Sequence, residues 1–317
     1  MDLPVGTILE AALPVFLLLL LGYALRRGRV LTAEADSSLM KLVIRVFYPC
    51  LYLDFIIGNP ALKGAANILT APVVGFFTTA GGFLVAYGVA RAIGLKRGEG
   101  LRTFTFSNGI YNYGYIPIPL ILALFPGRET AGVLLVHNVG VEVAVWTVGI
   151  LLLVGRFERG MLRKLINPPL LALGVALFVN GTGLDGAVPD WLGSLVGMLG
   201  ACSVPIGIIL AGASIADLLN WQQMRELPRV PLASIGVRLA LLPALFLAAA
   251  AFLPGISTEL RQVIIVQAAM PAGIFPIVLS RHYGGDAGVA VKVVLATTLA
   301  CVVTMPLWLR LGTAFVF

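Results

Sequence analysis

Two apolar segments half a chain apart contain glycine, proline and side-chain amides in matching order. Residues 114–118 read Gly-Tyr-Ile-Pro-Ile, and residues 273–277 read Gly-Ile-Phe-Pro-Ile, an offset of 159. At the same offset Asn108 corresponds to Gln267, so an amide precedes each glycine by six positions. Two further matches have an offset of 156, namely residues 131–133 with 287–289 and Pro49 with Pro205. Three matches at nearly one offset predict an internal repeat.

Prolines in these two segments would interrupt a helix, because proline has no N–H and collides with the carbonyl four residues earlier. Pro117 would free the carbonyl of Tyr113, and Pro271 that of Gln267. Interrupted backbone at membrane depth must be buried in protein or line a wet cavity, where half-helix N-termini attract anions and freed carbonyls attract cations. The alternative is a pair of ordinary proline kinks packed by small residues.

We predict that the two interrupted segments form a substrate site in which the backbone holds an anion. Asn108 and Gln267 are expected to line its cavity, and Tyr111, Tyr113 and Tyr115 to pack around it and line it. The complete predicted substrate-binding set is Asn108, Asn112, Gly114, Pro117, Pro119, Gln267, Pro271, Gly273 and Pro276.

Ionisable residues inside apolar segments are costly in lipid and are usually functional or paired. Glu142 lies mid-segment with Asn138 on the same helix face, which suits binding of a coupling proton or sodium ion; a buried hydrogen-bonded pair is the alternative. Lys292 could attract an anion or snorkel to the interface. The predicted ion-coupling residues are Glu142, Asn138, His137 and Lys292. Interface anchoring or helix bridging is the interpretation for Asp54, Arg45 and Arg238.

Catalytic motifs do not occur in the sequence. It contains no nucleophile elbow, zinc-protease motif or nucleotide-binding loop, and its three cysteines have no metal-ligand spacing. We therefore predict that the protein is not an enzyme and uses no cofactor or metal beyond a coupling proton or sodium ion.

The elements that position these residues follow from composition. Hydrophobic residues make up 59% of the 317 positions and charged residues 12%, about half the charge of a soluble globular chain. Because a bilayer core of roughly 30 Å needs about 20 apolar residues per helix, this composition predicts an all-α polytopic membrane protein. Ten apolar windows are expected to span the bilayer: residues 7–25, 39–57, 70–93, 101–124, 131–154, 165–180, 191–214, 230–253, 260–280 and 288–310.

Ten spans divide into two repeats of five, predicted as residues 1–156 and 157–317. Because five is odd, the second repeat must enter the membrane from the opposite side. Such inverted repeats are typical of secondary transporters, whose substrate sites lie near the midplane where broken helices meet. The fourth and ninth spans are the predicted broken helices.

Basic residues predict the orientation. Fifteen of the 22 lie on connections after odd-numbered spans, and four lie on the termini and the other connections. Positive residues stay cytoplasmic, so both termini are expected outside the plasma or inner membrane. The net charge of +7 is explained by this topology, and no nucleic-acid partner is expected.

Three short sequence motifs in the spans resemble those of the auxin efflux carrier family, which includes plant PIN auxin exporters and bacterial malate or malonate permeases. They are Asn112-Tyr113-Gly114 leading to Pro119-Leu120, Met270-Pro271-Ala272-Gly273, and Thr297-Thr298 followed by Pro306-Leu307-Trp308. The chain is similar to the compact bacterial type. Its motif positions are Asn112, Gly114, Pro119, Pro271 and Gly273, while Pro117 and Phe275-Pro276 depart from the usual pattern.

The resemblance implies ten helices in two inverted repeats, with spans four and nine crossing at the substrate site. It also implies a scaffold of spans one, two, six and seven, a transport domain of spans three to five and eight to ten that moves like an elevator, and a homodimer. The predicted function is secondary active transport of small organic anions, such as malate, malonate or auxin-like acids. The alternatives are an uncoupled anion facilitator, a membrane sensor and, less favoured, an intramembrane lipid enzyme.

Overall fold

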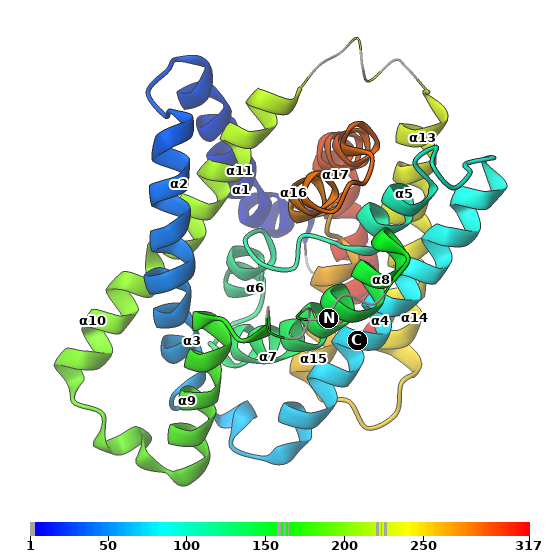
Figure 1. Ribbon diagram of the computed structural model, residues 1–317. Helices are drawn as coiled ribbons and strands as arrows, with labels where there is room; N and C mark the ends of the chain where they lie inside the picture. The colour runs from blue at the N-terminus through cyan, green and yellow to red at the C-terminus, as the bar shows by residue number, and fades with distance from the viewer. Residues whose placement is uncertain are drawn as a thin grey trace.

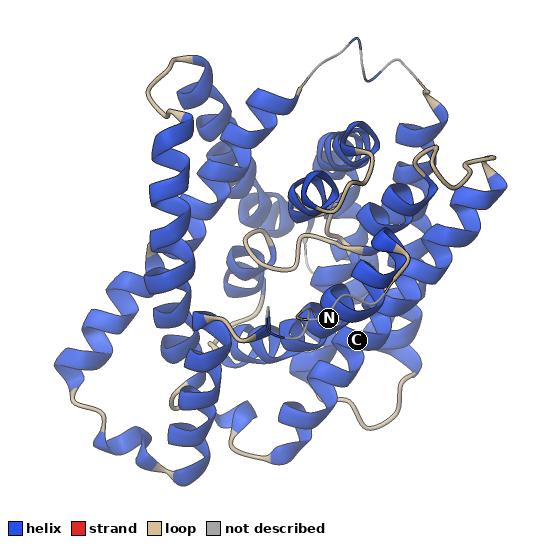
Figure 2. Cartoon of the chain, viewed as in Figure 1, coloured by secondary structure: helices blue, strands red, loops and turns tan. Residues whose placement is uncertain are grey.

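A computed structural model describes residues 4–156, 160, 163, 165–219, 222, 224 and 227–317. Every regular element in these residues is a helix, which confirms the predicted all-α class for this part of the chain (Figure 2). One isolated antiparallel bridge, between Tyr111 and Ala272, joins two loops.

The first half of the chain contains ten α-helical or π-helical segments and one 3-10 turn within the described residues. They are α1 (Val5–Arg27), α2 (Ala33–Leu42), η1 (Val43–Phe47), α3 (Tyr48–Ile56), η2 (Pro60–Leu62), α4 (Ala65–Ala92), α5 (Leu101–Gly109), α6 (Pro117–Leu124), α7 (Glu129–Ala144), η3 (Val145–Gly149) and α8 (Ile150–Val154). The second half contains α9 (Pro168–Thr182), η5 (Leu184–Ala187), α10 (Asp190–Ala201), α11 (Ser203–Leu218), α13 (Arg229–Gly236), η6 (Val237–Leu241), α14 (Leu242–Phe252), α15 (Thr258–Ala268), α16 (Phe275–His282) and α17 (Ala287–Val316).

Six helical runs in the described residues are long and apolar enough to cross a bilayer, so the protein is an integral membrane protein. They are Val5–Arg27, Ala65–Ala92, Glu129–Val154, Asp190–Leu218, Arg229–Phe252 and Ala287–Val316. The apolar helix Pro168–Thr182 is shorter. The count of ten spans therefore stays a prediction. Several boundaries also differ. α2 begins six residues and α4 five residues before their predicted windows, and α17 continues six residues beyond its window.

Two of the predicted windows are interrupted helices. α5 and α6, with 9 and 8 residues, are separated by residues 110–116, and α15 and α16, with 11 and 8, are separated by residues 269–274. At a rise of about 1.5 Å per residue, none of these pieces can cross a hydrocarbon core alone. The breaks fall at the two glycine–proline motifs, as the sequence predicts.

The helices pack as two groups (Figure 1). In the first, α1 packs against α11, and α3 packs against α9 and α10. In the second, α4 packs on α5 and α7, α15 packs on α7 and α14, and α17 packs on α13. The two interrupted helices belong to the second group, and contacts of α1 with α6 and α17 join the groups.

Glycines allow close helix approach within each group, as small residues do in membrane proteins. A Cβ atom on Gly140 of α7 would overlap the backbone of Pro72 in α4, and a Cβ atom on Gly22 of α1 would overlap that of Ile209 in α11. The α4–α7 and α1–α11 pairs therefore depend on the absence of a side chain at these positions.

Gly140→Ala is expected to destabilise the protein by about 1–3 kcal/mol, because the α4 and α7 backbones must separate to admit the methyl group. The measurement is the melting temperature of purified protein in detergent. Gly81→Ala on α4 is the matched control, since a Cβ atom there meets nothing within 4 Å. Equal melting temperatures for the two variants would contradict the close α4–α7 contact.

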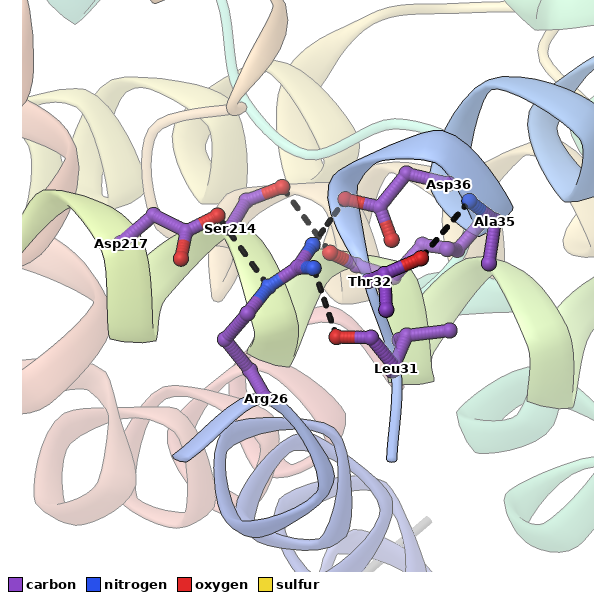
Figure 3. A network of polar contacts seen from close by, with 8 residues as sticks. Arg26, Leu31, Thr32, Ala35, Asp36, Ser214 and Asp217 are labelled. Atoms are coloured by element: carbon purple, nitrogen blue, oxygen red, sulfur yellow. Dashed lines mark hydrogen bonds and ion pairs between the residues drawn. The ribbon is translucent and has the colours of Figure 1, made fainter. Parts of the chain in front are cut away.

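An ion-pair network holds one end of the first group together (Figure 3). The guanidinium of Arg26, at the end of α1, pairs with Asp36 of α2, and its Nε lies 3.2 Å from a carboxylate oxygen of Asp217 in α11. Its Nη1 also donates to the carbonyl of Leu31 at 2.7 Å. One mostly buried cation thus connects three helices that are distant in sequence.

Candidate functional site

The two helix breaks meet and bond through their backbones. The N–H of Asn112 donates to the carbonyl of Pro271 at 2.8 Å, and the N–H of Gly273 donates to the carbonyl of Ile110 at 3.0 Å. Because Gly273 has no side chain, the two loops approach closely: a Cβ atom there would lie 3.2 Å from the carbonyl oxygen of Tyr111. The breaks therefore form one structural unit, which we call the crossing.

The carbonyl of Tyr113 is the centre of the polar contacts at the crossing. It accepts hydrogen bonds from Asn138 Nδ2 at 2.8 Å and from Gln267 Nε2 at 3.4 Å. Gln267 Nε2 also lies 3.3 Å from Asn138 Oδ1. Pro117 cannot supply the helical N–H that this carbonyl would otherwise accept. Side chains from α7 and α15 replace it, which ties both helices to the first break.

A cavity of about 430 Å³ lies between the crossing and the first helix group. Its lining comes from α2, η1, α3, α9 and α11 on one side, and from the crossing, α7, η3 and α16 on the other. Aromatic rings dominate the wall, and no lysine or arginine is present among the described lining residues. The aromatic lining residues are Tyr48, Tyr52, Tyr111, Tyr113, Tyr115, Trp146 and Phe275.

Backbone N–H groups at the crossing are left without partners. Within the described part of the chain, the N–H groups of Tyr113, Gly114 and Ile274 make no hydrogen bond, and all three residues line the cavity. The side-chain amide of Asn112 is also on the lining, and its nitrogen has no protein acceptor there. α6 and α16 both begin at the crossing and direct the positive ends of their dipoles toward it. These donors suit a carboxylate.

Glu142 is the one charged side chain of the described lining. The hydroxyl of Tyr113 donates to its Oε1 at 2.6 Å, and Trp146 Nε1 donates to its Oε2 at 2.9 Å. Both carboxylate oxygens are thus held by residues that also line the cavity. The half-buried carboxylate is therefore oriented next to the crossing.

The structure brings five of the predicted site residues onto the cavity wall: Asn112, Gly114, Gly273, Asn138 and Glu142. Tyr111, Tyr113 and Tyr115 both pack and line it, as expected. Pro271 is part of the crossing, and Pro117, Pro119 and Pro276 lie in the helices that follow the breaks; none of the four lines the cavity. His137 and Lys292 are buried outside the lining.

The lining of the described cavity does not include Asn108 or Gln267. Asn108 Nδ2 donates to its own helix at Phe104 and to Ser234 Oγ of α13 at 3.3 Å, so this amide faces away from the lining. Gln267 Nε2 donates instead to the carbonyl of Tyr113 and so helps to fix the position of that residue. The equal spacing of these amides from the glycines indicated shared helix positions, but not which neighbour each would face.

The sequence interpretation did not place Arg238 at the crossing and missed four aromatic lining residues. Arg238 was expected to anchor at an interface or to bridge helices. Its Nε donates to the carbonyl of Met270 in the second break, so it does bridge two helical segments, and its side chain is fully buried beside the crossing. Phe275 lies inside the Gly-Ile-Phe-Pro-Ile segment of residues 273–277, and Tyr48 directly precedes Pro49, so both rings adjoin prolines that the sequence analysis singled out. Trp146 lies four residues after Glu142 on one helix face, whereas Tyr52 has no such local signal.

Ser214, which lines the cavity, lies beside the Arg26 network in Figure 3. Contacts on the other side join the groups away from the lining. Arg128 at the start of α7 pairs with Asp54 of α3, and Asn59 Nδ2 lies 3.3 Å from the carbonyl of Arg128. These contacts hold the two groups together outside the described lining.

Comparisons with known proteins agree with a membrane carrier. The model of a family described as "membrane transport protein" matches residues 7–160 and 157–309. The chain is also 27% identical over 304 residues to an uncharacterized transporter of Methanothermobacter thermautotrophicus, an alignment that covers 94% of this chain and 96% of that relative.

Proposed function

This chain belongs to the membrane transport protein family, and on that premise we propose that it is a secondary active transporter of small organic anions. The match confirms the resemblance to auxin efflux carriers. The observation that carries the proposal is the set of unpartnered N–H groups at the crossing, inside a cavity between two helix groups.

Anion binding at the crossing requires donors without competing acceptors. The N–H groups of Tyr113, Gly114 and Ile274 and the amide of Asn112 would donate to a carboxylate, as backbone N–H groups do in anion-binding nests. The aromatic wall would hold the apolar part of the substrate, since ligand sites combine mostly apolar lining with few polar groups. The cavity volume suits a molecule of the size of malonate or indole-3-acetate.

An elevator motion is the proposed transport mechanism. The first helix group would be the scaffold and the second the transport domain, within ten spans that form two inverted repeats. Tyr115 of the crossing packs its ring against Gly207 of α11 and edge-on against Tyr48, at 5.5 Å between ring centroids. Such contacts rely on packing rather than on a continuous hydrogen-bonded ladder. Sliding of the second group would still have to break the polar contacts of Asp54 and Asn59 with the start of α7.

The conformation described here would face the cytoplasm. The Arg26 network lies on the side of the connections predicted to be cytoplasmic, and the cavity extends toward it. The Asp54–Arg128 pair would close the opposite side. Sliding of the second group would have to break that pair, whose cost is small because it is partly exposed.

Glu142 is the proposed coupling residue. An ionised carboxylate would repel an anion in the same cavity, and a bound proton or sodium ion would remove the repulsion. Anion and cation would then favour each other's binding by the same factor, which is the thermodynamic requirement for coupling. Asn138 would position the site through the carbonyl of Tyr113.

The test is transport current in proteoliposomes on a solid support, with malate, malonate, short monocarboxylates and indole-3-acetate as probes. Each acid is applied with and without an imposed proton or sodium gradient. We expect a saturable current for at least one acid that changes with one of the gradients. Radiolabelled counterflow detects electroneutral exchange, and absence of both signals from folded protein would overturn the proposal. Saturable flux that never accumulates against a gradient would indicate a facilitator instead.

A further inference from the structure

Arg238 is a cation buried at membrane depth with no acidic partner among the described residues. It lies in η6, inside the membrane-spanning run Arg229–Phe252, and its residue exposure is 0%. Its Nη1 and Nη2 atoms have no hydrogen-bond partner, and the ion pairs of the described chain do not include it. Membrane proteins usually pair such charges or use them.

The guanidinium contacts both halves of the crossing. Its Nε donates to the carbonyl of Met270 at 3.1 Å, in the second break. Its carbon atom lies 5.1 Å from the ring centroid of Tyr111, in the first break, and 5.3 Å from that of Phe246. The carbonyl and the two ring faces offer partial negative charge but do not neutralise a full positive charge. Arg238 therefore adds a positive charge without an acidic partner to this side of the crossing.

Tyr111 separates this charge from the cavity. The same ring that faces the guanidinium belongs to the cavity lining. A carboxylate on the cavity side of Tyr111 would lie about 10 Å from the guanidinium. At the effective dielectric constant of protein sites, attraction between two unit charges at this distance still raises the binding affinity about tenfold. The lining itself offers no lysine or arginine in its described part, and Arg238 is a fixed positive charge buried directly behind Tyr111.

We propose that Arg238 selects anions over neutral molecules, because its charge acts on the substrate through the Tyr111 ring without contacting it. Arg238 is thus a positioning and charge-selecting residue, and the inference rests on the proposed anion transport. The partner that this buried cation lacks within the protein is the transported carboxylate.

The experiment compares acids with their neutral isosteres. Dissociation constants of purified protein are measured for indole-3-acetate against indole-3-acetamide and for malonate against malonamide, with wild type, Arg238→Met, Arg238→Lys and Arg45→Met. Methionine fills similar space, and removal of a buried unpaired charge is often neutral or stabilising. Arg45 is the matched control, since it also lies in a π-helical turn of the membrane region but is exposed and outside the lining.

We expect Arg238→Met to weaken binding of the acid by about tenfold and to leave binding of the amide unchanged, whereas Arg238→Lys and Arg45→Met retain the wild-type preference. Equal weakening of acid and amide, or unchanged binding of the acid, would overturn the inference. If Arg238→Met does not fold, the Arg238→Lys variant decides, because a structural role predicts equal losses for both probes there. Failure of the wild type to bind any acid would instead overturn the proposed function.

Discussion

Replacement of Asn112 by alanine is expected to lower kcat/KM for anion transport by about a hundredfold, because one hydrogen bond to a charged group contributes about 1.5–3 kcal/mol. The backbone N–H of Asn112 donates to Pro271, and alanine keeps this bond across the crossing. The substitution removes the side-chain donor together with a long hydrogen bond, 3.5 Å, that Oδ1 accepts from the N–H of Ile116. Folding should be nearly unchanged. The measurement is initial transport rate against concentration in proteoliposomes, with melting temperature measured in parallel.

Ser214→Ala is the matched control for Asn112→Ala. Ser214 also lines the cavity, but its hydroxyl donates to the carbonyl of Leu210 within α11 at 2.9 Å and is not available to a substrate. Asn112→Asp, which places a negative charge at the same position, should impair transport at least as strongly as alanine. Wild-type kinetics in Asn112→Ala would remove this residue from the site.

Glu142→Gln is expected to uncouple transport from the ion gradient. The amide keeps the shape of the carboxylate and can accept a hydrogen bond from Tyr113 or Trp146, but it cannot take up a proton or neutralise a sodium ion. Substrate exchange at equal concentrations should therefore persist while uphill accumulation is lost. The measurement is the accumulation ratio under the gradient that drives the wild type, beside radiolabelled counterflow.

Tyr113→Phe separates coupling from local structure in this cluster. It removes the hydroxyl that holds Glu142 Oε1 but keeps the carboxylate and the backbone carbonyl at the crossing. Coupling should survive in Tyr113→Phe, with altered affinity for the coupling ion, and disappear in Glu142→Gln. Unchanged uphill accumulation by Glu142→Gln would show that the carboxylate serves only the hydrogen-bonded cluster.

Much of the site was accessible from local sequence. The helix breaks could be predicted because proline removes the hydrogen bond to the carbonyl four residues earlier. Pro117 therefore indicates that the carbonyl of Tyr113 lacks its helical partner. The helical membrane class followed from composition, since too few charged residues exist to cover a water-facing surface. The homodimer, the orientation and the coupling ion remain predictions.

Partners across the fold could not be predicted in the same way. The bonds of Asn112 to Pro271 and of Gln267 to Tyr113 join residues more than 150 positions apart, and no periodicity encodes them. Asn108 is an example. Its position in a helix could be predicted from the sequence, but its contact with Ser234 depends on how α13 packs against α5.

The sequence by itself determined where helices must end, because backbone hydrogen bonding is local and proline and glycine act within one turn. Only the tertiary structure decided which freed groups meet which side chains, since packing of α7, α13 and α15 around the crossing sets those distances. Arg238 illustrates the difference. Its charge was visible in the chain, but its burial between Tyr111 and Met270 results from the approach of two loops that are remote in sequence.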